Sequence, residues 1–159
     1  MIEWEDVSRE FEFTGSWRDI YVFGTTMSDW QAALDALRRS SMQLSYFHGG
    51  QATALPARAQ DAFPEEGQAD RLLRAQVAGV TLNCHFFSDT EIEFDLDPRE
   101  VHGQEQLDAL TTFMQLVADA CGKPAVLTEE NLREALILRT TPDSEMVEYH
   151  SPTRGWQAG

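Results

Sequence analysis

Basic residues are scarce in this chain. Twelve Lys and Arg stand against 27 Asp and Glu, which gives a formal net charge of −15 over 159 residues. Affinity for nucleic acid comes from Lys and Arg that displace counterions from phosphates, and anionic membrane surfaces attract basic segments. The charge therefore argues against nucleic-acid and membrane partners. It favours a basic protein as the partner, because opposite charges steer association over long distances.

Long hydrophobic runs and closely spaced cysteines are also missing. No apolar stretch approaches the ~20 residues that a membrane-spanning helix requires. The opening residues 1–6, MIEWED, are acidic and polar, unlike a secretory signal peptide. The two cysteines, Cys84 and Cys121, lie far apart in the sequence, and we expect both to be buried free thiols. Together these features predict a cytoplasmic protein.

The sequence lacks the motifs of the common cofactor and catalytic sites. It has no phosphate-binding loop, no dinucleotide fingerprint and no nucleophile elbow, and its four histidines show no metal-site spacing. We therefore predict no cofactor and no metal, and we assign no catalytic residue. A non-enzymatic role is favoured, although the sequence leaves the question of activity open.

The most informative segment is 91–97, EIEFDLD, in which four carboxylates alternate with three large apolar side chains. Successive strand residues point to opposite faces, so the pattern predicts a strand with one core face and one anionic face. Segment 80–87 alternates similarly, and pairing it with Cys84 opposite Phe94 makes the two apolar faces coincide. The same register places His85 opposite Glu93. The predicted partner-binding residues are Glu91, Glu93, Asp95, Asp97 and His85.

The remaining patterns predict a two-layer α+β fold. Amphipathic helices are expected at 28–39, capped by Ser28, and at 104–121, ended by Gly122. Strands are expected at 17–23, 42–47, 71–77, 80–87, 91–97 and 145–149, with an edge strand near Phe11 and Phe13 and a short helix over 128–134. The sum is an antiparallel or mixed sheet of five to seven strands with both main helices on one face. Residues 1–150 are predicted to form one domain, and residues 151–159 a tail.

Several stretches of the chain resemble small stand-alone bacterial proteins of uncharacterised function, some of them immunity proteins that neutralise toxins. The resemblance lies in 17–22 (WRDIYV), Asp29-Trp30, 91–95, Phe113-Met114 and 127–131 (LTEEN). It implies a single-domain binding protein without a cofactor, and it transfers no functional residue.

Two other functions remain open on the sequence alone. Residues 48–69 show no sustained period, and such long loops in small domains are often functional. A small-molecule binder or an enzyme could use this segment together with His48 or His85. Alternatively, an exposed edge strand could pair between copies in a homo-oligomeric scaffold. The first hypothesis remains an immunity-like protein that binds and blocks a basic toxin through its acidic strand.

Overall fold

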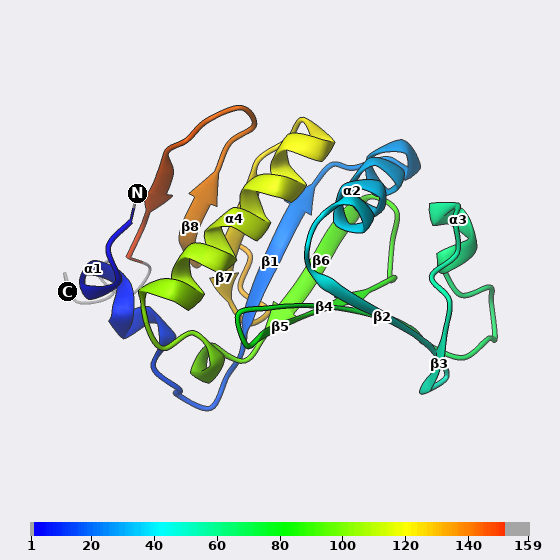
Figure 1. The fold of residues 1–159 in the computed structure, drawn as a ribbon, viewed down its shortest axis with the longest axis horizontal. Coiled ribbons are helices and arrows are strands. Elements are labelled where there is room, and N and C mark those ends of the chain that lie inside the picture. The colour runs from blue at the N-terminus through cyan, green and yellow to red at the C-terminus, as the bar shows by residue number, and fades with distance from the viewer. Residues whose placement is uncertain (1, 152–159) are drawn as a thin grey trace.

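The computed structural model describes residues 2–151 as a nine-stranded sheet with helices on one of its faces. All neighbouring strands are antiparallel, in the order β3-β2-β4-β5-β6-β1-β7-β8-β9. Figure 1 shows α2 and α4, the two long helices, lying against the same face of the sheet. The two-layer α+β prediction is confirmed, but the predicted count of five to seven strands is wrong.

In chain order the strands are β1 (Arg18–Phe23), β2 (Gln43–His48), β3 (Gln51–Thr53), β4 (Arg71–Val77), β5 (Val80–His85), β6 (Glu91–Leu96), β7 (Ala125–Glu129), β8 (Leu136–Thr140) and β9 (Val147–Tyr149). The helices are α1 (Trp4–Val7), α2 (Met27–Arg39), α3 (Ala59–Ala62) and α4 (Gln104–Cys121), with the 3₁₀-helices η1 (Ser8–Phe11) and η2 (Pro98–Glu100).

Local signals fix the ends of the two long helices. Thr26 and Asp29 form a capping box at the start of α2: the Thr26 hydroxyl accepts from the Asp29 N–H at 3.2 Å, and the Asp29 carboxylate accepts from the Thr26 N–H at 3.0 Å. The cap is thus Thr26 rather than the predicted Ser28. At the end of α4, Gly122 adopts a left-handed conformation with φ 64°, as predicted.

The core lies between the helices and the facing side of the sheet. Its largest fully buried side chains include Trp30 of α2, Phe113 of α4 and Phe94 of β6. Phe94 and Phe113 meet edge to face with their ring centroids 4.8 Å apart. The predicted register of β5 and β6 is confirmed, since Cys84 pairs with Phe94. Cys84 and Cys121 are both free and buried, also as predicted.

Two local predictions are wrong because tertiary packing overrides short sequence patterns. Phe11 ends the 3₁₀-helix η1 instead of belonging to an edge strand. Its ring centroid lies 5.8 Å from that of Trp4. The backbone N–H of Trp4 donates to Oε1 of Gln104 in α4 at 2.6 Å. The predicted 128–134 helix is absent. Strand β7 continues through Glu129, because Thr128 pairs with β1, and a turn follows.

The segment 48–69, predicted to be a long loop or a short helix between turns, contains the short helix α3 and, in addition, the strand β3. Strand β3 pairs with β2 to form a hairpin, and α3 packs against α2. Both edge strands of the sheet, β3 and β9, have only three residues. Such short edges expose little backbone for pairing between copies, and the homo-oligomer hypothesis stays a hypothesis.

Within residues 2–151 the structure has no helix that is both long enough and apolar enough to span a membrane. The predicted tail, 151–159, lies outside the described residues except for Ser151.

Candidate functional site: the uncovered sheet face

The face of the sheet opposite α2 and α4 carries a cluster of polar side chains on its three central strands. Antiparallel pairing aligns residues of β5, β6 and β1 side by side. One row is His85–Glu93–Tyr21 and the next is Asn83–Asp95–Asp19. Because side chains alternate along a strand, both rows point away from the core residues Cys84, Phe94 and Ile20. Three of the predicted binding residues therefore belong to one cluster.

Asp95 is the hydrogen-bonding centre of one half of this cluster. Its Oδ2 lies 3.0 Å from Nε2 of His85, and its Oδ1 accepts from Nδ2 of Asn83 at 3.1 Å. The hydrogen bond to Asp95 raises the pKa of His85, although partial burial acts in the opposite direction. The aspartate thus favours the protonated imidazolium and fixes the direction of its ring.

Asp19, Tyr21 and Glu93 form the other half of the cluster. The Tyr21 hydroxyl donates to Asp19 Oδ2 at 3.1 Å, and Glu93 lies directly opposite Tyr21 across the β1–β6 pair. Burial raises the pKa of both carboxyl groups, and their mutual repulsion adds to the rise for Glu93. Neither carboxylate forms an ion pair with a described Lys, Arg or His. The two carboxyl groups therefore lie close together without a direct ion-pair partner among the described residues, although His85 lowers the pKa of Glu93 from a distance.

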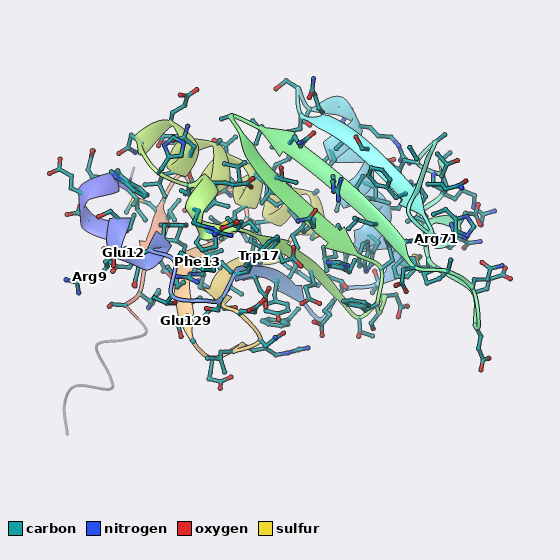
Figure 2. All side chains as sticks on the ribbon, turned by 90° about the horizontal axis from the view of Figure 1, so that it is seen from below. Arg9, Glu12, Phe13, Trp17, Arg71 and Glu129 are labelled. Carbon is teal, nitrogen blue, oxygen red and sulfur yellow. The ribbon has the colours of Figure 1, made fainter. Side chains whose placement is uncertain are left out.

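The turn between β7 and β8 folds over one side of this face. The backbone N–H of Asn131 donates to Asp19 Oδ2 at 2.8 Å, which leaves Asp19 only 3% exposed. Glu130 accepts from the backbone N–H of Trp17 at 3.3 Å and so ties the turn to the start of β1. Figure 2 shows Trp17 near the middle of the molecule, Glu129 further towards the side of Arg9 and Glu12, and Arg71 towards the opposite side.

The same turn places a guanidinium on the sheet. Arg133 Nη2 lies 2.9 Å from Oε1 of Glu91. Its guanidinium carbon lies 5.3 Å from the ring centre of Tyr21 and 5.4 Å from that of Phe23. The two rings stack with centroids 5.0 Å apart. We call Glu91, Tyr21 and Phe23 the guanidinium cage, because a carboxylate and two aromatic rings together suit this cation.

Asp97, the fifth predicted binding residue, has a structural role in this region. Its carboxylate accepts from the Arg99 N–H at 3.0 Å and thereby caps η2, and it also pairs with the Arg99 guanidinium at 2.8 Å. The predicted carboxylate row is therefore less anionic than its sequence suggests. Among residues 2–151, Glu91, Asp95 and Asp97 each have an ion-pair partner, and Glu93 has none.

Sequence reasoning missed three residues of this site. Asp19 and Tyr21 alternate on β1, but residues 20–23 (IYVF) form a run that is apolar on both faces of the strand and typical of a buried strand. Pairing β1 with β6 would have placed these two side chains beside Asp95 and Glu93 and so indicated their polar contacts. Arg133 lies in the segment that was predicted to be a helix, and no local pattern indicates its return to the sheet.

A second acidic surface lies on the other side of the molecule. Asp108 and Asp119 of α4, with Asp143 and Glu145 of the β8–β9 connection, line a groove of about 680 Å³. Asp119 accepts there from the backbone N–H of Asp143 at 2.8 Å. These four carboxylates contribute to the net charge of −15, so part of that charge lies away from the uncovered sheet face.

His48, the other histidine proposed for a ligand site, lies exposed at the end of β2. Among residues 2–151, no group of three or more His, Cys, Asp or Glu is arranged to hold a metal ion. Comparison of the chain with protein-family models, with curated proteins and with solved structures found no match.

Proposed function

We propose that this protein is a non-enzymatic binding protein that captures a basic protein partner on the uncovered face of its sheet, as an immunity-like inhibitor captures a toxin. The observation that carries the proposal is the guanidinium cage, in which Glu91, Tyr21 and Phe23 already hold the chain's own Arg133. A surface that binds one guanidinium has the chemistry to bind another.

Arg133 is weakly enough held for a partner's arginine to replace it. Its side chain is 56% exposed and belongs to a turn. Exposed ion pairs of this kind contribute about 0–1 kcal/mol. A partner that supplies several cations at once can displace Arg133 without a large cost.

The unbalanced charges of Asp19 and Glu93 add to the attraction. Two partly buried carboxylates that lack a cation raise the free energy of the unbound protein. A lysine or arginine of the partner placed beside Glu93 would lower that free energy, and this gain would add to the free energy of binding. Such a partner would also associate quickly, in a salt-sensitive manner.

The side chains of the uncovered face are held in place by hydrogen bonds within the protein, and this order supports the same function. Tyr21, Asn83 and His85 are held by hydrogen bonds to neighbouring carboxylates. Side chains that are already fixed lose little conformational entropy when a partner arrives. Phe23, which is 39% exposed, and Phe87, which is 74% exposed, provide apolar contact area beside the charged groups.

Calorimetry with an arginine-containing peptide tests the proposal. The wild type and the double variant E91Q/E93Q are titrated at low and at high salt. A double variant of two exposed residues, E65Q/E66Q, is the matched control because it removes the same charge elsewhere. We expect E91Q/E93Q to weaken binding about tenfold or more, in line with the loss of two charge-assisted contacts, and E65Q/E66Q to change it little. Equal losses in the two variants would show attraction by net charge alone and would contradict the proposal.

A further inference from the structure

A pocket of about 510 Å³ opens near residues 48–70, at the end of the sheet where β2 and β5 finish and β4 begins. Its volume falls in the range of small-molecule sites. Its lining includes the apolar side chains of Phe47, Leu72 and Phe87 and the nitrogen-bearing side chains of Arg71, Arg74 and His85. Pairing across the strands aligns Phe47, Leu72 and His85 in a row that forms its floor.

Two arginines line this pocket in a chain of net charge −15. Among the described residues, neither Arg71 nor Arg74 forms an ion pair. One carboxylate, that of Asp70, also lines the pocket, but it forms no ion pair with either arginine. No carboxylate among the described residues therefore pairs with the two arginines at this pocket.

Arg71 is held by neutral groups alone. Its Nη1 donates to the Tyr46 hydroxyl at 3.0 Å and its Nη2 to Oε1 of Gln68 at 3.2 Å. Its Nε is buried and has no hydrogen-bond partner in the described structure. An arginine fixed by neutral acceptors keeps its full positive charge, and an unsatisfied donor adds to the cost of that arrangement.

Flat aromatic rings form the apolar walls of this pocket. Phe87 is 74% exposed and stacks on His85, with ring centroids 5.1 Å apart and an interplanar angle of 3°. The Arg74 guanidinium carbon lies 4.9 Å above the Phe47 ring. These planes suit a planar apolar body, and the arginines suit a negative group attached to it.

We propose that this pocket binds a small aromatic anion, with its ring against Phe47, Leu72 and Phe87 and its anionic group towards Arg74. This pocket shares His85 and Phe87 with the proposed partner surface but none of the three residues of the guanidinium cage, and its ligand has the opposite charge to the partner proposed above. The two proposals can therefore fail independently. The Asp95 carboxylate beside His85 and the Asp70 carboxylate at the rim limit the ligand to a small anion rather than a highly charged one.

NMR titration of the ¹⁵N-labelled protein tests this inference with three probes. These are 2-naphthoate, its neutral analogue 2-naphthalenemethanol, and inorganic phosphate. We expect 2-naphthoate to shift amide signals at 47–50, 70–74 and 85–87, and to bind at least about fivefold more tightly than either other probe, the gain expected from one charge-assisted contact.

Two variants and a control complete the experiment. R74Q should weaken naphthoate binding about fivefold or more, and F87S should weaken naphthoate and the neutral analogue alike. R139Q is the control, because Arg139 lies on the same sheet but pairs with Glu148 at 3.4 Å. The proposal is overturned if the neutral analogue binds as well as naphthoate, if R74Q has no greater effect than R139Q, or if no shifts occur at these positions up to about 5 mM ligand, a concentration that would detect even millimolar affinity.

Discussion

His85 hydrogen-bonds to Asp95, its diagonal neighbour, and not to Glu93, which lies directly opposite. Nε2 of His85 and Oδ2 of Asp95 are 3.0 Å apart, although the strand register pairs His85 with Glu93 and Asn83 with Asp95. The diagonal pairing leaves Glu93, which lies opposite Tyr21, without an ion pair among the described residues. It thus creates the two properties on which the proposed function depends: a fixed imidazole and an unbalanced carboxylate.

The pKa of His85 should depend on Asp95. The hydrogen bond to Asp95 raises the pKa of His85 above its ordinary value of 6.5, so D95N should lower it. The shift is measured from the His85 ring proton signals in an NMR pH titration, with R139Q as the control. An unchanged His85 pKa in D95N would contradict the diagonal pair.

The same pair gives a pH dependence of stability. Because the folded pKa of His85 is raised, its stabilisation is fully present below about pH 6.5 and is lost as pH rises through the folded value. The free energy of unfolding of wild type minus that of H85Q should therefore decrease with rising pH. Urea denaturation at a series of pH values measures it, and a difference that grows with pH would contradict the assignment.

Removing the charge of Glu93 should stabilise the protein while weakening partner binding. Burial, followed by repulsion from Asp19 and Glu91, raises the pKa of Glu93, so its ionised form costs free energy in the folded state. E93Q should gain on the order of 0.5 kcal/mol at pH 7. The gain should disappear below about pH 4.5, where the unfolded-state carboxyl is also protonated. If E93Q is less stable than the wild type at pH 7, the charge of Glu93 is already balanced.

Removing Arg133 should open the guanidinium cage. R133Q frees Glu91 and both aromatic rings, so an arginine-containing peptide no longer competes with the chain's own guanidinium. We expect its affinity to rise about two- to fivefold, which corresponds to an exposed ion pair. R99Q, which breaks the separate Asp97 pair, is the control. Weaker binding by R133Q would mean that Arg133 shapes the surface for the partner instead of occupying it.

The helix layer should depend on the ring pair in its centre. Phe113 is fully buried, and its ring centroid lies 4.8 Å from that of Phe94. F113A should destabilise the fold by about 3–5 kcal/mol, as large-to-small core changes do. Thr112, its exposed neighbour on α4, gives the control T112A. A loss below about 1 kcal/mol in F113A would contradict the position of α4 on the sheet.

Alternation and helical periodicity were sufficient to predict the centre of the fold. The apolar faces of 80–87 and 91–97 coincide when Cys84 lies opposite Phe94, and the structure has this register. The helix of 104–121 followed from its stripe and from Gly122. The predictions failed where short patterns competed with long-range pairing. Thr128 resembles a helix cap, but pairing with β1 extends the strand through it.

The candidate site was only half predictable for the same reason. Glu91, Glu93, Asp95 and His85 are neighbours within one hairpin, and local spacing identifies them. Asp19 and Arg133 join them across more than 35 residues of sequence, through β1 and the β7–β8 turn. No local pattern records such a contact, and the neutralisation of Glu91 by Arg133 could not be foreseen.

The central claim is that cations bind the uncovered sheet face and not the acidic groove along α4. Amide NMR mapping with an arginine-containing peptide at physiological salt tests this most directly. We predict shifts at 19–23, 91–95 and 131–134 that vanish in E91Q/E93Q and persist in D108N/D119N, which neutralises the groove. Shifts confined to 108–119 and 143–147, abolished by D108N/D119N alone, would contradict it.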